Sequence, residues 1–337
     1  MTAKRKQILV LGLRIVISLG MLAVLIVRVP SFDWADLIPE WTIVTALWFS
    51  VAALLTLAGI VLSAMRWQKV LDALDIRTSL PHLVRHYLAG QFVSNVLPTT
   101  IGGDVLRVSR LSKETGEPPG TFASVVLERL TGWLVLPVIT IVGFTINPGL
   151  RHLHTATRVA LGVAVGTLIL LVGVLAAVAS KRIGGRFASS EGWRRFAGAI
   201  HLGLSRLREH PSAAANVLLV GFAYQLALVL AAVAAAKALD LPNAAGLTAL
   251  LAFFPAVLIV QVLPISMSGL GVREGAFVLF LGPLGVAQQD AIALGLLLYL
   301  LNLGVSLLGA PAFATGGGRA GPTGQAATGQ PSASLAA

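Results

Sequence analysis

The segment VLPTTIGGDVLR at residues 96–107 interrupts one apolar stretch of this chain, and VLPISMSGLGVR at residues 262–273 interrupts another in the same way. In each copy a Gly follows the Pro by five residues and an Arg follows it by nine. Inside a membrane, interrupted backbone and an Arg are tolerated only within protein or around a cavity. Paired interruptions of this kind are typical of substrate sites in membrane transporters. The doubled motif therefore predicts a polar site inside a membrane protein.

The composition is that of a polytopic membrane protein. Hydrophobic residues make up 56% of the chain and charged residues only 12%, whereas soluble domains contain roughly 25% charged residues. The net charge of +11 does not indicate a nucleic-acid partner. The basic residues lie between apolar stretches, and no basic domain with interleaved aromatic residues is present. We expect the chain to have the membrane and its lipids as partners.

Six apolar stretches reach the length of about 20 residues that a membrane helix needs. Two further segments, 83–111 and 246–283, are interrupted by Pro and Gly, and each is either a re-entrant hairpin or a pair of full spans. We expect an all-α bundle of about six full spans and two broken hairpins arranged as an inverted repeat. This domain covers residues 1–313, and residues 314–337, rich in Gly, Ala and Ser, are expected to be a disordered tail. The six stretches are 8–28, 41–65, 121–147, 157–180, 212–236 and 288–312.

The distribution of Lys and Arg predicts the orientation, because cytoplasmic loops are enriched in both. Basic residues precede the first stretch, follow the second at Arg66, and are densest in the loop at 181–211. We expect a multi-pass protein of a bacterial-type inner membrane with both termini in the cytoplasm. The two motif copies then enter from opposite sides. The 181–211 loop is either a basic amphipathic helix on the anionic leaflet or an ordinary topology signal.

Charged residues next to the interruptions are candidates for function, because a charge inside the bilayer is costly. Asp104 and Arg107 are three residues apart, so they share a helical face and can pair. Arg273 and Glu274 follow the second interruption. We predict that the two Arg side chains bind a lipid phosphate and that the two acidic residues pair with them when no lipid is bound.

A third charged pair, Glu128 and Arg129, lies inside an apolar stretch. Adjacent helical residues point apart, so these two side chains should have separate partners. Here and at the two interruptions, the alternative is a set of ion pairs that only assembles the bundle. Further candidates lie beside the interruptions: the backbone at Gly103 and Gly269 for an anion, and Asn95 and Ser266 for a polar path or for hydrogen bonds to freed carbonyl groups.

The sequence offers little for catalysis. The absence of Cys excludes disulfides, Cys-ligated zinc and thiol chemistry. His82 and His86 share a helical face, but no acidic third ligand is near them in the sequence, so no metal site is predicted. No Walker loop or hydrolase elbow is present. We expect neither an enzyme nor a cofactor.

The stretch RHYLAGQFVSNVLP at 85–98, continued by GGDVLR at 102–107 and ASVVLER at 123–129, resembles the lysylphosphatidylglycerol synthase transmembrane-region family. The segment PISMSGLGVREGA at 264–276 resembles it too. The resemblance implies a helix bundle with re-entrant segments. The chain departs from the family's pattern at Glu128, because members of the family frequently have Asp at this position. Lysyl transfer is not implied, because the soluble aminoacyl-transfer domain of the synthases is absent from the sequence.

The resemblance also implies a function. Such a bundle is a flippase that moves an anionic or modified phospholipid, or a lipid-linked group, between leaflets. The alternative is a membrane scaffold that presents lipid to a separate lipid-modifying enzyme, which would then be a protein partner.

Overall fold

The structure is a computed structural model, which describes residues 3–27, 40–96, 102–180, 194–263, 266 and 268–316. Within these ranges every regular element is helical. Helices satisfy their own backbone hydrogen bonds, as a membrane interior requires. Short 3₁₀ turns in the described part of the chain connect longer helices: η2 (Pro148–His152), η4 (Asn243–Ala245) and η5 (Gly282–Leu284). The α-helices are α1 (Ala3–Val27), α2 (Ile43–Ala73), α3 (Leu80–Val96), α4 (Gly102–Thr115), α5 (Pro118–Ile146), α6 (Thr155–Ala179), α7 (Arg194–Glu209), α8 (Pro211–Ala238), α9 (Leu247–Gln261), α10 (Val272–Leu281), α11 (Gln288–Leu307) and α12 (Ala310–Ala314).

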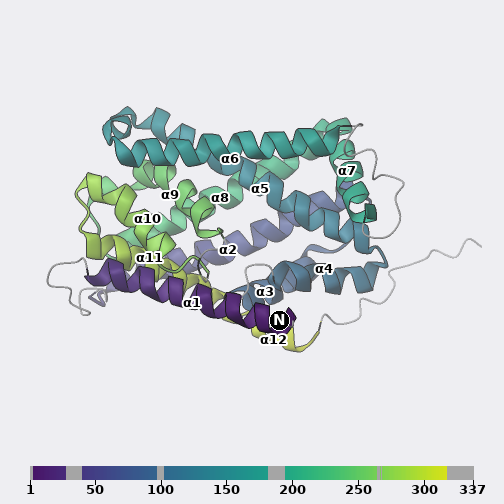
Figure 1. Ribbon diagram of the computed structural model, residues 1–337, viewed down its shortest axis with the longest axis horizontal. Helices are drawn as coiled ribbons and strands as arrows, with labels where there is room; N and C mark the ends of the chain where they lie inside the picture. The colour runs from purple at the N-terminus through teal and green to yellow at the C-terminus, as the bar shows by residue number, and fades with distance from the viewer. Residues whose placement is uncertain are drawn as a thin grey trace, which may run out of the picture.

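Five of the described helices are long and apolar enough to cross a membrane: α2, α5, α6, α8 and α11. They coincide with five of the six predicted spans, and the all-helical membrane bundle is confirmed. The first predicted span, 8–28, overlaps α1, which has 25 residues. Figure 1 shows α1, α2 and α6 running along the long axis of the molecule. The predicted span count stays a prediction.

Helix α2 continues to Ala73, beyond the end of the predicted span at residue 65. Its first turn is capped by Thr42, whose side chain accepts a hydrogen bond from the backbone N–H of Thr45 at 3.1 Å. The extension places Arg66 inside the helix rather than in a loop, and it is buried with its neighbour Trp67. The predicted end of the span at residue 65 was therefore wrong: the helix continues because Trp67 and the apolar residues after it pack into the bundle. The side of the membrane that this end of α2 faces stays a prediction.

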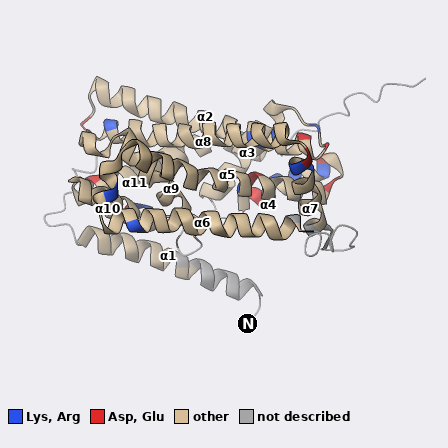
Figure 2. Ribbon diagram, turned by 90° about the horizontal axis from the view of Figure 1, so that it is seen from above, with Lys and Arg blue, Asp and Glu red and all other residues tan. Residues whose placement is uncertain are grey.

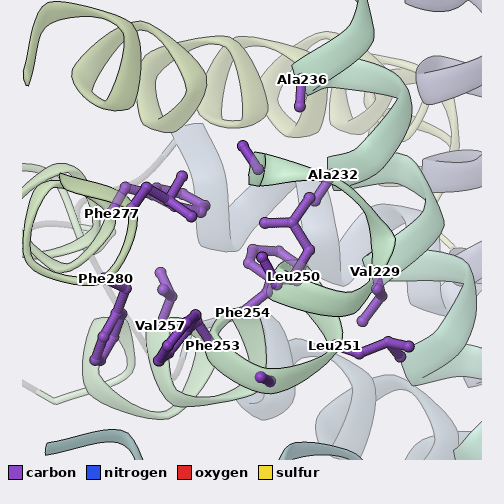
Figure 3. Packing of buried hydrophobic residues seen from close by; sticks show 14 of the residues in the cluster. Val229, Ala232, Ala236, Leu250, Leu251, Phe253, Phe254, Val257, Phe277 and Phe280 are labelled. Carbon is purple, nitrogen blue, oxygen red and sulfur yellow. The ribbon is translucent and has the colours of Figure 1, made fainter. Parts of the chain in front are cut away.

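The largest apolar core joins α5, α8, α9 and α10 (Figure 3). Phe253 stacks on Phe280 with ring centroids 5.3 Å apart, and Phe254 stacks on Phe277 at 5.8 Å. Phe144 from α5 meets the edge of Phe253 at 5.4 Å. Aromatic pairs add about 0.5–1.5 kcal/mol each beyond their burial. This core holds α9 and α10 side by side as an antiparallel hairpin.

The first interrupted segment forms a second antiparallel hairpin, α3–α4. The end of α4 returns to the beginning of α3, where Glu114 contacts His82 and His86. Gly103 in the first turn of α4 lies against Gly90 in α3. Each helix is shorter than a full span. Whether the hairpin is re-entrant stays a prediction.

The two hairpins lie toward opposite ends of the bundle, α3–α4 near α7 and α9–α10 near the other end (Figure 1). Both were predicted as broken segments, 83–111 and 246–283. The residues between their helices at 97–101, together with 264, 265 and 267, fall outside the described ranges. The inverted repeat therefore stays a prediction.

Helix α7 lies within the loop that the sequence predicted to be either amphipathic or a topology signal. Its apolar side chains Ile200, Leu204 and Leu207 pack against Val70 of α2 and Leu127 of α5. The helix is thus docked on the bundle through its apolar face, rather than free to place that face in a leaflet.

The C-terminal boundary differs slightly from the prediction. Residue 314, the predicted start of the tail, belongs to α12. Phe313 of α12 packs against Phe92 of α3 with ring centroids 5.7 Å apart, and the described chain ends at Gly316. The predicted tail at 317–337 lies outside the described residues.

Candidate anion-binding site

Glu128 is the centre of a buried set of ion pairs between α2, α4 and α5. It is fully buried in α5. Its Oε1 accepts a hydrogen bond from Nη2 of Arg66 in α2, and its Oε2 accepts one from Nη2 of Arg107 in α4 at 3.3 Å. One carboxylate therefore connects three helices.

Asp104 extends this set toward the surface. Its Oδ1 accepts hydrogen bonds from Nη2 of Arg107 at 2.6 Å and from Nη2 of Arg129 at 2.9 Å. The side chain of Arg129 is 42% exposed, compared with 3% for Arg107. Glu128 and Arg129 thus have different hydrogen-bond partners, but Arg107 contacts both carboxylates. We refer to Arg66, Asp104, Arg107, Glu128 and Arg129 as the charge cluster.

Aromatic side chains hold two of the guanidinium groups in place. Arg107 lies over the ring of Tyr87, with Cζ 4.3 Å from the centroid, and 4.9 Å from the ring of Trp67. Arg66 lies 5.0 Å from the ring of Tyr224. Trp67 is fixed in turn by a hydrogen bond from its Nε1 to Oγ of Ser124 at 2.9 Å. Such cation–π contacts contribute about 0.5–2 kcal/mol each.

The close approach of α3 and α4 requires glycine at position 103. A Cβ atom there would overlap the carbonyl oxygen of Gly90 and Oγ of Ser94. This approach brings Arg107, one turn later in α4, onto the ring of Tyr87. The sequence predicted an anion-binding backbone at Gly103. The structure assigns it a packing role that positions Arg107.

The charge cluster contains more guanidinium groups than carboxylates. Three Arg side chains face two acidic ones, which leaves a net charge of +1 when all five are ionised. Among the described residues, Nε and Nη1 of Arg66, Nη1 of Arg107 and Nε of Arg129 have no hydrogen-bond partner. Buried charged donors without partners are costly. Guanidinium donors of this kind suit the oxygens of a phosphate, so the cluster can accept one further monoanion.

A cavity of about 140 Å³ lies next to the charge cluster. Tyr87 and Tyr224, whose rings contact Arg107 and Arg66, line its wall. Its other polar lining residues are Thr56, Ser63, Gln91, Gln261, Arg273 and Asn302. The volume suits a small polar group rather than acyl chains. Of the polar residues predicted beside the first interruption, Asn95 does not line the cavity; its Nδ2 donates to Oδ1 of Asn302 at 3.2 Å.

Arg273 and Glu274 form a closed pair in the second hairpin. Nη2 and Nε of Arg273 donate to Oε1 of Glu274 at 2.7 and 3.1 Å. Oε2 of the same carboxylate accepts the backbone N–H of Gly271 at 2.6 Å. Arg273 also lies 5.3 Å from the ring of Tyr299. Because Arg273 lines the cavity and Arg107 stands behind Tyr87, the two motif Arg side chains approach the same cavity.

The turn before α10 explains one further predicted residue. Gly269 has φ +77°, in the left-handed region, and a Cβ there would lie 2.8 Å from Cβ of Gln261. Glycine is required at this position by both the backbone and the space. Ser266 is buried, and its Oγ has no hydrogen-bond partner among the described residues. The structure brings neither residue into the charge cluster.

An apolar groove between α4 and α5 opens beside the exposed end of the charge cluster. Its volume is about 710 Å³. Val105, Val108 and Trp133 are among its apolar lining residues, and Asp104 and Arg129 line it as well. The groove therefore combines an apolar wall with two members of the charge cluster, an arrangement that suits an acyl chain joined to a charged headgroup.

Charged residues gather at the end of the bundle that carries α4 and α7, with a smaller group at α10 (Figure 2). Sequence reasoning missed Arg66, Tyr87, Tyr224 and Asn302 as parts of this region. For Arg66 a signal was present, since the apolar residues Trp67, Val70 and Leu71 continue the helical pattern after it. Tyr87 lies in the stretch 85–98 that carries the family resemblance, whereas Tyr224 and Asn302 have no sequence signal that distinguishes them from ordinary helix residues.

The chain was compared with protein families and with curated protein sequences. No curated protein sequence matches the chain. The family model described as the lysylphosphatidylglycerol synthase TM region matches residues 10–309, which include the charge cluster, the cavity and both hairpins. The match concerns the membrane region of the synthases, which supports a multi-pass membrane protein related to lipid handling. The chain belongs to the lysylphosphatidylglycerol synthase transmembrane-region family.

Proposed function

We propose that this protein moves phospholipids with an anionic headgroup between the two leaflets of a bacterial-type inner membrane. The observation that carries the proposal is the charge cluster, in which buried guanidinium donors outnumber the carboxylates and remain partly unpaired. A phosphodiester bears one negative charge at neutral pH, which matches the excess charge of the cluster. Binding such a headgroup would supply acceptors for donors that otherwise lack them.

The apolar groove gives the lipid a path to the charge cluster. An acyl chain in the groove between α4 and α5 places its phosphate at Arg129, which is partly exposed. From there the phosphate reaches Arg107 by exchanging with Asp104, which contacts both Arg side chains. Arg273 is the next guanidinium along this path, because it lines the cavity on the other side of Tyr87.

Movement between leaflets requires the cavity to open to one side at a time. The two hairpins lie toward opposite ends of the bundle (Figure 1), and Tyr87 of the first and Arg273 of the second line the cavity. A shift of one hairpin against the other changes access without dismantling the five long helices. In this mechanism Glu128 and Glu274 hold the Arg side chains when no lipid is bound.

Lipid exchange in proteoliposomes tests the proposal. The vesicles contain phosphatidylglycerol with a fluorescent label that a membrane-impermeant reductant bleaches, so loss beyond about half of the signal reports exchange. We expect Arg107→Ala and Arg273→Ala to slow exchange at least tenfold, since each loses a charged hydrogen-bond donor worth about 1.5–3 kcal/mol. The matched control is Arg158→Ala at an exposed position of α6. Equal exchange by all four proteins, above that of empty vesicles, would overturn the assigned role.

The alternative function, a scaffold that presents lipid to a separate enzyme, is favoured by one observation. Arg206 and Arg208 are exposed on α7, at the end of the bundle where charged residues gather. A scaffold would bind labelled lipid without exchanging it, and a partner enzyme would co-purify. Arg208→Glu should then abolish co-purification while lipid binding remains.

A further inference from the structure

Three potential metal ligands meet where the beginning of α3 contacts the end of α4. Nε2 of His82 lies 2.6 Å from Oε2 of Glu114 and 2.9 Å from Nε2 of His86. Nε2 of His86 lies 3.2 Å from the same carboxylate oxygen. One ligand atom of each residue therefore points at a common space. The sequence placed the two His residues on one helical face but offered no third ligand, because Glu114 lies 32 residues after His82.

The three separations fit the coordination sphere of one ion. Zinc binds His nitrogen and carboxylate oxygen at about 2.0–2.2 Å. The three ligand atoms lie about 1.7 Å from a common centre in the plane that they define. An ion placed above this plane can therefore lie about 2.1 Å from all three atoms, as zinc requires. The edge of a tetrahedron of this size is about 3.3 Å, so an ion would spread the three ligands by a few tenths of an ångström.

The surroundings leave room for the ion and for a fourth ligand. The side chain of His86 is 1% exposed, while those of His82 and Glu114 are 16% and 20% exposed. Solvent therefore reaches the three ligands from the side of His82 and Glu114. The charged neighbour Arg110 is engaged elsewhere: its Nη1 and Nη2 donate to the carbonyl oxygens of Ala312 and Phe313 at 2.8 and 2.7 Å.

His86 turns its Nε2 toward the other two residues, and its Nδ1 has no hydrogen-bond partner among the described residues.

We propose that His82, His86 and Glu114 form a binding site for a divalent transition metal of the zinc class, with three protein ligands and one position open to solvent. Two imidazoles and one carboxylate favour Zn²⁺, with Co²⁺ as a spectroscopic substitute, over Mg²⁺ or Ca²⁺. The ion joins α3 to the end of α4. Since α4 carries Asp104 and Arg107, metal binding stabilises the hairpin that supports the charge cluster, but the site is separate from it.

Metal titration of the full chain tests this proposal. The protein is purified in detergent with an affinity tag that contains no His, stripped with a chelator, and titrated with Zn²⁺ against a chromogenic chelator. Wild type should bind one equivalent. Loss of a residue that only orients a metal ligand weakens metal binding roughly 10–100-fold. Because His82→Ala and Glu114→Gln each remove a ligand itself, we expect them to weaken Zn²⁺ binding by more than that. His210→Ala, at an exposed position before α8, is the matched control and should bind as wild type does.

Two further measurements separate coordination from a purely structural role. Bound Co²⁺ should give visible absorption bands in wild type and His210→Ala and lose them in Glu114→Gln, which keeps the shape of the side chain. Zn²⁺ should raise the thermal unfolding midpoint of wild type but not of Glu114→Gln. Failure of wild type to bind Zn²⁺, or equal affinities for wild type, His82→Ala and Glu114→Gln, would show that these residues form only a hydrogen-bonded contact and would overturn the proposal.

Discussion

The two helical hairpins carry the same residue types close to the start of their second helices and use them differently. In α4, Asp104 and Arg107 belong to a network that includes side chains of α2 and α5. In α10, Arg273 and Glu274 satisfy each other, and the carboxylate also accepts a backbone N–H. The first hairpin therefore depends on distant partners, whereas the second is closed on itself.

This difference has a consequence for ligand binding. Arg273 has the carboxylate of Glu274 to itself, so an added anion changes its pairing little. A cluster with three guanidinium groups and two carboxylates gains acceptors and charge balance from one. We therefore expect the first hairpin to contribute more to anion affinity and the second to line the path. Four sets of substitutions break or sharpen this comparison, from the largest expected effect to the smallest.

Removing the central carboxylate should have the largest effect. Glu128→Ala leaves Arg66 and Arg107 buried without their shared partner, and breaking buried pairs of this kind costs about 3–5 kcal/mol. The corresponding change in the second hairpin, Glu274→Ala, should cost about 1–3 kcal/mol, because Arg273 still faces the cavity. Thermal unfolding in detergent measures both. Equal losses of stability would mean that the first hairpin depends no more on its shared carboxylate than the second hairpin depends on Glu274.

Separating α3 from α4 should have the next largest effect. Gly103→Ala introduces a Cβ that overlaps the backbone of Gly90, and overpacking costs about 1–3 kcal/mol. The control is Gly166→Ala in the middle of α6, where nothing lies within 4 Å. That variant should be unchanged or more stable by up to about 1 kcal/mol. A neutral Gly103→Ala would contradict the close approach.

Exchange of Arg for Lys keeps the charge and removes the planar fork of donors. Arg107→Lys should weaken binding of a short-chain phosphatidylglycerol about tenfold, which corresponds to about 1.4 kcal/mol. For Arg273→Lys we expect only a few-fold loss, since Glu274 already holds that side chain. Isothermal titration in detergent compares the two. A larger effect at Arg273 would reverse the assignment of the stronger anion contact.

The smallest effect concerns the contact between α11 and the first hairpin. Oδ1 of Asn302 accepts hydrogen bonds from Gln91 and Asn95, both at 3.2 Å. Asn302→Leu removes the acceptor of both hydrogen bonds but should cost only about 1 kcal/mol in all, because the two donors are part-buried and water can replace the lost acceptor. Asn216→Leu, at an exposed position of α8, serves as the control and should stay within about 0.5 kcal/mol of wild type by thermal unfolding.

Part of the candidate site could be predicted because its contacts are local. The pairing of Asp104 with Arg107 follows from a separation of three residues on a helix. The different partners of Glu128 and Arg129 follow from the divergence of adjacent helical side chains. Arg66 was misplaced because a positive charge at the end of an apolar stretch normally marks a loop, and its acidic partner lies 62 residues away.

The sequence by itself determined the membrane class, five of the long helices, the two interrupted segments and the residues that carry charge there. These properties depend on the cost of placing polar groups in a bilayer, which acts on each segment separately. Only the tertiary structure decided that Arg66 shares Glu128 with Arg107, that Tyr87 stands between Arg107 and the cavity, and that Glu114 reaches the two His residues of α3. Such contacts depend on which helix faces pack together, and no local pattern of hydrophobicity or spacing specifies that choice.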